Sequence, residues 1–346
     1  MSSVAFATDP RFAAHTMPQH PENAARLEAV VQQLHRDRLW ERLLHVPIEA
    51  ASDEAITAVH TPAYLARLAR TEKLGGLAMW GADTYITPAS YRVARLAAGA
   101  VVRVVDAVLS GEAQSGIAAV RPPGHHATPD EAMGFCLLNN VAIAARHALR
   151  AHGLARVLIV DYDVHHGNGT QDVFYDDPAV LYISTHQSPL YPGTGRVKEI
   201  GRGAGEGYTV NIPMPPGVGD AGYRRVFDEV IVPLARRFAP QLVLVSLGLD
   251  AHWGDPLANM RLSLAGYDVL ARTLFALASE LCEGRIVFVA EGGYNVQALA
   301  HGWANVTRAL LGAGPPVDPL GAATGEETPI SSVLKRAKRI HKLNSY

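Results

Sequence analysis

Four short apolar segments of the chain each run directly into a cluster of polar residues. GIAAV (116–120) meets RPPGHHATP, VLIV (157–160) meets DYDVHHGNG, LVLVSLG (242–248) meets LDAHWGDP, and RIVFVA (285–290) meets EGGYN. Longer helix-like segments separate the four, a spacing that predicts βαβ units and a parallel sheet. Ligands of open α/β sheets bind beyond the carboxyl ends of the strands. We therefore expect the four polar clusters to converge on one site.

The other apolar and amphipathic segments complete this α/β pattern. Strands are predicted at 116–120, 156–163, 180–185, 241–250 and 285–291. Helices are predicted at 21–37, 90–111, 139–153, 222–240 and 264–284. Residues 1–311 are expected to form one domain, and 312–346 a loop and a basic tail packed on or extending from it. We interpret the tail as a solvated surface helix rather than as a nucleic-acid or acidic-partner site.

Composition narrows the class of protein. Hydrophobic residues make up 48% and charged residues 18%, which allows a large core. The formal net charge of −2 does not favour nucleic-acid or membrane-surface partners. Two cysteines, Cys136 and Cys282, argue against a disulfide framework and favour a reducing, cytoplasmic location. The N-terminus does not resemble a secretory signal, and no apolar run approaches the ~20 residues that cross a bilayer.

Asp163, His165 and Asp250 are the candidate metal ligands. The first two are two residues apart, so on a strand they would point to the same side, and Asp250 ends another predicted strand. One imidazole and two carboxylates, with a position left for water, suit a catalytic divalent ion such as zinc or iron(II). The alternative is a buried ion pair of Asp163 and His165 alone. The neighbouring clusters favour the metal site.

The adjacent His125 and His126 are candidates for acid–base work near a metal-bound water. Asp161 and Asn168 are natural partners for the two rings. A ring backed by a carboxylate favours its charged form, whereas a ring backed by an amide does so less. We therefore expect the two histidines to differ in basicity. A surface-loop pair is the alternative interpretation, but the flanking strand and the MGFCLLNN segment argue against it.

Aromatic residues beside glycines supply the remaining candidates. Tyr294 follows two glycines at a strand end, where its phenol can donate a hydrogen bond to an oxyanion. Gly134-Phe135 and Tyr191, which precedes Pro192-Gly193, can form two walls around a slender aliphatic chain. Ordinary core packing is the alternative for each of these aromatic residues.

Six segments together resemble the histone deacetylase family, which includes the bacterial deacetylase-like amidohydrolases and the acetylpolyamine amidohydrolases. They are RPPGHHA, GFCLLNN, VDYDVHHGNGTQDVFY, YPGTG, GLDAHWGDPL and EGGYN, and the resemblance covers residues 20–311. It implies an arginase-like α/β fold with a mainly parallel eight-stranded sheet flanked by helices and an active site at the strand C-terminal ends. Asn168, with DTYITP, YPGTG and HWGDPL, resembles class II-like members.

The resemblance also implies roles for the site residues. Zinc would be held by Asp163, His165 and Asp250. His126 would be the principal general base and acid, with His125 as its electrostatic partner. Tyr294 would polarise the scissile carbonyl and hold the oxyanion. The implied substrate-binding residues are Gly134, Phe135, Tyr191 and Gly292, with Gly134 accepting a hydrogen bond from the scissile amide.

Structural potassium is a further implication of the resemblance. Its first site would use Asp161, Asp163, His165, Ser184 and Thr185, largely through backbone oxygens. A second site would use Phe174, Asp177, Val180 and Tyr208. Arg26, in HPENAAR, matches a buried arginine below the active site.

The expected function is zinc-dependent removal of acetyl or related acyl groups from acyl-lysine side chains of peptides or proteins. One alternative is deacetylation of small acetylated amines such as acetylpolyamines, although the long insertion of those enzymes is not found before RPPGHH. A non-catalytic acyl-lysine-binding module is a second alternative. Arginase-like hydrolysis with two manganese ions is disfavoured, because the HH and Tyr motifs replace the second carboxylate cluster. The sequence leaves open the native substrate and whether the chain forms a homo-oligomer.

Overall fold

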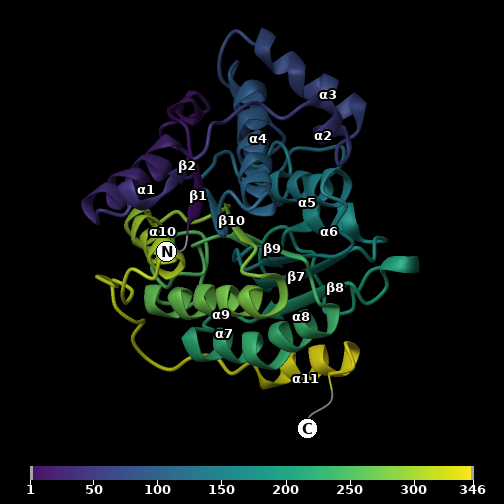
Figure 1. Ribbon diagram of the computed structural model, residues 1–346, viewed down its shortest axis with the longest axis vertical. Helices are drawn as coiled ribbons and strands as arrows, with labels where there is room; N and C mark the ends of the chain where they lie inside the picture. The colour runs from purple at the N-terminus through teal and green to yellow at the C-terminus, as the bar shows by residue number, and fades with distance from the viewer. Residues whose placement is uncertain (1–2, 344–346) are drawn as a thin grey trace.

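The computed structural model describes residues 3–343 (Figure 1). Within them, eight strands form one sheet in which every neighbouring pair is parallel. In sheet order the strands are β2 (Leu44–His45), β1 (Val4–Ala7), β5 (Ser115–Ala118), β10 (Ile286–Ala290), β9 (Leu242–Leu247), β6 (Val157–Asp161), β7 (Val180–Gln187) and β8 (Thr209–Met214). The predicted eight-stranded sheet is confirmed. A separate antiparallel hairpin pairs β3 (Ala78–Trp80) with β4 (Thr84–Ile86).

Helices cover both faces of the sheet. They are α1 (Ala24–Arg36), α2 (Asp53–Thr57), α3 (Pro62–Ala69), α4 (Ser90–Leu109), α5 (Asn140–Ala151), α6 (Asn168–Phe174), α7 (Asp220–Val226), α8 (Val232–Phe238), α9 (Leu264–Cys282), α10 (Val296–Leu311) and α11 (Ser331–Ile340). Figure 1 shows α4, α5 and α6 on one side of the sheet and α7, α8, α9 and α11 on the other. Among residues 3–343, no helix has the length and hydrophobicity of a membrane span.

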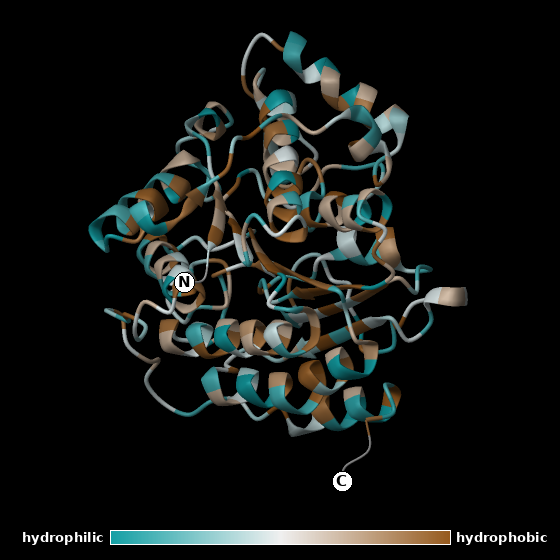
Figure 2. Cartoon of the chain, viewed as in Figure 1, coloured by the Kyte–Doolittle hydropathy of each residue, from teal (hydrophilic) through white to brown (hydrophobic). Residues whose placement is uncertain are grey.

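Burial on both faces explains the continuous apolar runs in the strands. Val157 and Ile159 of β6 belong to the core cluster under α4 and α5. Leu158 and Val160 belong to the opposite cluster, which includes residues of α7, α9 and α10. Figure 2 shows the strands as a brown, hydrophobic layer between helices with hydrophilic outer faces.

The four strands with polar clusters at their ends lie side by side, in the order β5, β10, β9 and β6. Because parallel strands end at the same edge, their following loops meet. Helix caps then fix where those loops stop: Asn295 starts α10 by accepting a hydrogen bond from the Ala298 N–H at 3.1 Å, directly after Tyr294. Asn139 caps α5 in the same way, accepting from Ala142 at 3.1 Å.

Four of the five predicted strands extend past the observed ends, and two of these differences concern the candidate metal ligands. β6 ends at Asp161 rather than at residue 163, and β9 ends at Leu247 rather than at residue 250. Asp163 and His165 therefore lie in a bend, and alternation along a strand is not what brings them together. Strands β1 and β8 were not predicted.

The helical predictions need smaller corrections. The predicted helix 222–240 is two helices, α7 and α8, joined by the π-helical turn Phe227–Ile231. Pro233 follows this turn in the first turn of α8, where a missing N–H is tolerated. Helix α10 was not predicted. The basic tail forms α11, with Val333, Leu334 and Ala337 buried, and its residues 344–346 lie outside the described part of the chain.

Candidate active site

The structure brings the three predicted metal ligands together. His165 Nδ1 lies 3.1 Å from Asp163 Oδ1 and 3.2 Å from Asp250 Oδ2. One donor atom from each side chain lies within 4.8 Å of the others. All three come from loops after β6 and β9, which are neighbours in the sheet. These separations suit ligands that share one ion.

The surroundings of the two carboxylates also fit a cation. Asp250 Oδ2 is buried and, within residues 3–343, accepts no hydrogen bond. Burial and the negative charge of Asp163 raise the pKa of Asp250 to about 7. The other oxygens are held by backbone N–H groups, because Val164 donates to Asp250 Oδ1 at 2.9 Å and Gly292 donates to Asp163 Oδ2 at 2.8 Å. A bound divalent ion would satisfy the orphaned oxygen and relieve the repulsion.

A second cluster of metal-ligating residue types has a different geometry. His147 Nε2 and His152 Nε2 lie 2.6 and 2.7 Å from the same oxygen of Asp106, between α4 and the end of α5. These are ordinary hydrogen-bond distances in which each ring donates to the carboxylate. The cluster is also partly exposed. Asp163, His165 and Asp250 therefore remain the candidate metal centre.

Two glycines leave space for the carboxylates of Asp163 and Asp250. A Cβ atom on Gly248 would overlap Asp163 Oδ2, and one on Gly292 would overlap Asp250 Oδ2. Gly292 was predicted as a substrate-binding residue. That role stays a prediction; in the structure its N–H donates to Asp163 Oδ2, and the absence of a Cβ leaves space for Asp250 Oδ2.

If this site holds a divalent metal, Gly292→Ala is expected to weaken its binding, tested with zinc, at least 10- to 100-fold, because the added methyl group pushes the two carboxylates out of position. Competition with a chromogenic chelator measures the affinity. Gly76→Ala is the matched control, since nothing lies within 4 Å of a Cβ at that position. Equal zinc affinities of the two variants would contradict the prediction.

His125 and His126 lie with their ring centroids 4.0 Å apart and have the two predicted partners. His125 Nδ1 is 3.1 Å from Asp161 Oδ2, and His126 Nδ1 is 2.8 Å from Asn168 Oδ1. The Asn168 amide nitrogen donates to the His126 carbonyl oxygen at 3.4 Å, which supports this orientation of the amide. An amide oxygen only accepts, so His126 Nδ1 carries the proton and its Nε2 is left as a proton acceptor.

The pKa values of the two rings are shifted in opposite directions. Burial lowers the pKa of His125, but the charges of Asp161, Asp163 and Glu291 outweigh it and raise this pKa to about 10. For His126, burial and the positive charges of His125 and His165 hold the pKa well below its usual value. The carboxylate-backed ring thus has the higher pKa and the amide-backed ring the lower one, in the direction that the sequence suggested.

Glu291, which sequence reasoning missed, holds the histidine loop. Its Oε2 accepts hydrogen bonds from the backbone N–H groups of Gly124 at 2.7 Å and His125 at 3.1 Å, and its Oε1 accepts from Ser246 at 3.2 Å. Burial raises the pKa of Glu291 to about 7. The available signal was its position as the first residue of EGGYN, directly after a buried strand.

Arg26 positions the loop that carries Tyr294. Its guanidinium donates to the carbonyl oxygens of Glu291 at 2.7 Å and Gly293 at 2.8 Å, and lies 4.9 Å from the centre of the Tyr294 ring. On the other side of the loop, Asp255 accepts from the Tyr294 N–H at 2.7 Å. Asp255 was also missed. The Tyr294 backbone is thus held by two groups distant in sequence.

Tyr191 lies beside the histidine pair, and Phe135 lies beside Tyr294. The Tyr191 ring is 37% exposed and lies 5.1 Å from His126, while Phe135 lies 5.9 Å from Tyr294. Gly134 and Phe135 both have positive φ, +56° and +68°. The β3–β4 hairpin supports this loop, because Asp83 and Thr84 accept from the N–H groups of Gly134 and Phe135 at 3.2 and 3.0 Å. Sequence reasoning missed both hairpin residues.

The predicted potassium ligands lie near one another in two groups. Asp161 and Ser184 are register partners on β6 and β7, and the buried Thr185 Oγ1 has no hydrogen-bond partner within the described residues. In the second group, the backbone links Asp177 to Phe174 and Val180 to Asp177 at 3.1 and 3.5 Å. Tyr208 accepts from Tyr182, two residues after Val180, at 2.9 Å. Both potassium sites stay predictions.

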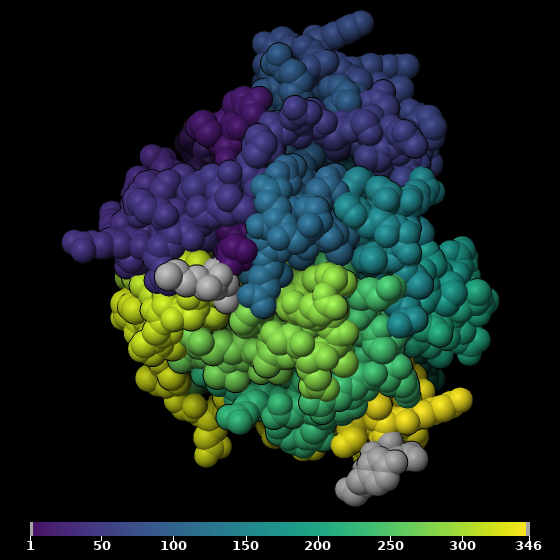
Figure 3. Space-filling model, viewed as in Figure 1, coloured from purple at the N-terminus to yellow at the C-terminus, as the bar shows by residue number. Residues whose placement is uncertain are grey.

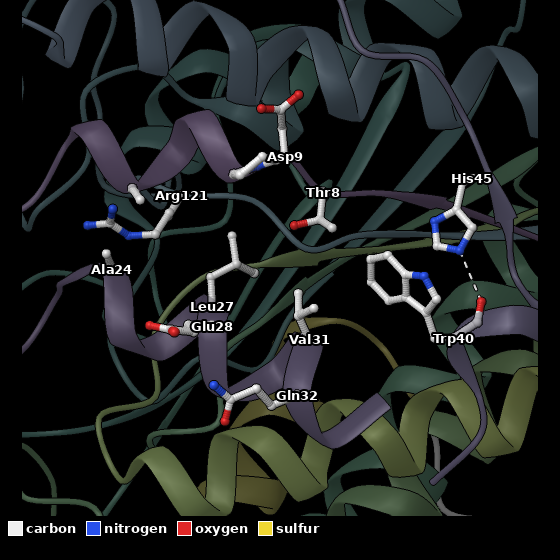
Figure 4. A pocket seen from close by; sticks show the side chains of 12 residues that line it. Thr8, Asp9, Ala24, Leu27, Glu28, Val31, Gln32, Trp40, His45 and Arg121 are labelled. Carbon is white, nitrogen blue, oxygen red and sulfur yellow. Dashed lines mark hydrogen bonds between the residues drawn. The ribbon is translucent and has the colours of Figure 1, made fainter. Parts of the chain in front are cut away.

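A pocket of about 580 Å³ lies elsewhere, between α1 and the loop after β1. Figure 4 shows Leu27 and Val31 of α1 along it, with Trp40 at one end and Arg121 at the other. None of the predicted metal, catalytic or substrate-binding residues lines this pocket. The candidate active-site residues therefore lie at the strand ends, and this cavity is separate from them.

Comparisons with known proteins identify the family of the chain. The model of the histone deacetylase domain matches residues 20–310. Histone deacetylase 14, chloroplastic, of Arabidopsis thaliana is 46% identical over 314 residues, which cover 86% of this chain and 74% of that protein. Polyamine deacetylase HDAC10 of Homo sapiens is 41% identical over 325 residues, which cover 91% of this chain and 47% of that protein.

Solved structures give the same result for the fold. The crystal structure of the HDA15 HD domain matches with a TM-score of 0.90 and 36% sequence identity, and the match covers 98% of this chain and 94% of that one. The arginase-like arrangement predicted from the motifs is thereby confirmed. With a domain model that spans most of its length and relatives above 40% identity, the chain belongs to the histone deacetylase family of amide hydrolases.

Proposed function

We propose that the protein hydrolyses the amide of acyl-lysine side chains in peptides or proteins. The observation that carries this proposal is the grouping of one orphaned metal-binding carboxylate, a neutral histidine and a tyrosine at the ends of adjacent strands. As the family resemblance implies, Phe135 and Tyr191 would line the passage for the aliphatic chain of the acyl-lysine. We also propose a cytoplasmic location, on the basis of the low cysteine content.

Asp163, His165 and Asp250 would hold the metal, for which we propose zinc with iron(II) as the alternative. When bound, the ion would act as a Lewis acid and lower the pKa of a coordinated water. His126 Nε2, left unprotonated by the Nδ1–Asn168 hydrogen bond, takes the proton of the attacking water and later gives it to the leaving amine. The cationic His125 stabilises negative charge beside it.

Tyr294 supplies the second polarising group. Burial raises the pKa of its phenol well above the usual value, so the hydroxyl stays protonated and can donate to the developing oxyanion. Arg26 and Asp255 fix the backbone on either side of it. The Gly134 carbonyl would accept a hydrogen bond from the scissile amide N–H, as the family resemblance implies.

Small acetylated amines are the second candidate substrates, because one relative is named a polyamine deacetylase. A panel of an acetyl-lysine peptide, a longer acyl-lysine peptide and N-acetylputrescine separates the two candidates by kcat/KM. The metal content of the same preparation identifies the ion. Release of acetate from the peptide at higher kcat/KM than from N-acetylputrescine is the expected result.

Tyr294→Phe is expected to lower kcat on the best substrate about 10²–10³-fold, because it removes one oxyanion donor. KM and zinc content should change little, since the ring and its Arg26 contact remain. Tyr175→Phe, at the end of α6, is the matched control. Preserved turnover in Tyr294→Phe would reject the proposed role of the phenol.

A further inference from the structure

A groove of about 560 Å³ runs between residues 193–198 and α11. Its charged lining consists of Arg196, Lys198 and Arg336, and no carboxylate lines it. All three side chains belong to exposed residues. Within residues 3–343, none of the three forms an ion pair. Three cations therefore surround one concavity without a carboxylate among the lining residues.

One end of the groove lies near Tyr191, which packs against His126. Two lining residues, Ser188 and Gly193, come three positions before and two positions after Tyr191. Thr194 Oγ1 lies 2.8 Å from Nδ1 of His166, which directly follows the metal-ligating candidate His165. The segment is therefore fixed to the loop that carries the metal site. A peptide chain advances ~3.3 Å per residue when extended, so we expect residues a few positions from the acyl-lysine to come near this segment.

Neighbouring acidic groups leave the positive charge of the groove in place. Glu199 is the nearest carboxylate in sequence, but it is turned inward, where it accepts from Gln171 at 2.9 Å and from the Gly195 N–H at 3.0 Å. Asp83 Oδ1 accepts hydrogen bonds from the Gly134 N–H and from the Thr84 hydroxyl. Neither carboxylate pairs with Arg196, Lys198 or Arg336.

Helix α11 holds Arg336 in position. Its apolar face, with Val333 and Leu334, is buried, and Lys338 pairs with Glu229 at 3.0 Å. Figure 3 shows α11 as a yellow segment packed against the green helices at one end of the molecule. The tail that was predicted to be a solvated helix thus contributes one charged wall of this groove.

We propose that this groove binds an acidic segment of the acylated substrate, so that the enzyme prefers acyl-lysines flanked on one side by aspartate, glutamate or another anionic residue. This rests on the proposed function. The charge complementarity favours an anionic peptide over a polyamine, because a cationic amine would be repelled by the same three side chains. Each exposed charge pair contributes little alone, but several together set specificity.

The test compares acetyl-lysine peptides that carry two glutamates on the amino side, two on the carboxyl side, or glutamines at both. At low salt, kcat/KM for one acidic peptide is expected to exceed that of the glutamine peptide about tenfold, mainly through KM. In Arg196→Gln/Lys198→Gln/Arg336→Gln this ratio should fall to about one. The control Lys335→Gln/Arg339→Gln changes exposed cations of the same helix that do not line the groove, and should keep the ratio.

The outcomes separate this inference from the proposed function. Turnover of the glutamine peptide by the unmodified protein tests the function alone. If that turnover is present but both acidic peptides react no faster, the groove proposal is wrong and the function stands. An equal loss of the ratio in the control variant would also overturn it, as would binding of single-stranded RNA to the groove without any acidic-peptide preference. A decline of the ratio with added salt supports it.

Discussion

His126→Gln lowers kcat/KM on an acetyl-lysine peptide by about 10²–10⁴-fold, the range expected for loss of a general base and acid. The reason is the proton arrangement at this ring. Asn168 Oδ1 fixes the proton on Nδ1, burial keeps the ring neutral, and Nε2 is therefore the free acceptor. A glutamine side chain can occupy much of the same space, but its amide cannot take up and release a proton near neutral pH.

Three measurements identify the cause of the loss. Zinc content should equal that of the unmodified protein, because His126 is outside the set of three metal donors. The unfolding temperature should change by only a few degrees, and the exposed His35→Gln should retain activity within twofold. Loss of zinc in His126→Gln would assign the residue to metal binding, and a decrease smaller than tenfold would move the general base to another group.

The junctions between strand and polar cluster could be predicted because their signal is local. Apolar runs such as VLIV and LVLVSLG are buried on both faces of a parallel sheet, and the change to aspartate and histidine marks the sheet edge. The reasoning about Asp163 and His165 was nevertheless wrong in detail. They meet in a bend beyond β6, where the His165 N–H donates to Asp163 Oδ1 at 2.9 Å, and not through alternation along a strand.

Residues that hold the site through distant contacts could not be predicted. Arg26 reaches the Tyr294 loop across more than 260 positions, and Asp255 reaches the same loop across 39. No local pattern reports such a pairing. Asp83 and Thr84 support Gly134 and Phe135 from a short hairpin that has few β-branched residues. Arg26 itself was found only because the family resemblance covers HPENAAR.

The missed strands have weak local signals. β1 is only four residues long and half alanine, which has low strand propensity. β8 contains Asn211 and Pro213, and a proline is expected only at the edge of a sheet. β8 is indeed the last strand in the sheet order. Tertiary burial, rather than propensity, makes both segments strands.

Glu22→Ala is expected to lower the free energy of unfolding by about 3–5 kcal/mol, because it leaves buried arginine charge without its partner. Glu22 is completely buried and accepts two hydrogen bonds from Arg121, both at 2.8 Å, and one from Arg26 at 3.2 Å. Tyr85 donates to it at 3.1 Å. Urea unfolding measures the change, and Glu28→Ala, at an exposed residue about one turn into α1, should stay within about 0.5 kcal/mol of the unmodified protein.

The pH dependence separates the charge of Glu22 from its packing. Burial alone would raise its pKa, but Arg121 and Arg26 outweigh burial and lower this pKa from 4.5 to about 2. A carboxylate whose pKa is depressed in the folded state stabilises it fully above the unfolded-state pKa, and the stabilisation is lost as the pH falls through 4.5 toward 2. The difference between these two pKa values corresponds to about 3 kcal/mol of folding free energy.

Glu22→Gln keeps the shape and removes the charge, so its deficit relative to the unmodified protein should be largest at pH 6–7 and shrink as the pH approaches 2. A deficit that is the same at every pH would mean that geometry, rather than charge, dominates at this position. Because Arg26 also holds the carbonyl oxygens of Glu291 and Gly293, the same substitution should raise the mobility of the Tyr294 loop. Hydrogen exchange at residues 291–295 should then become faster in Glu22→Gln and stay unchanged in Glu28→Ala.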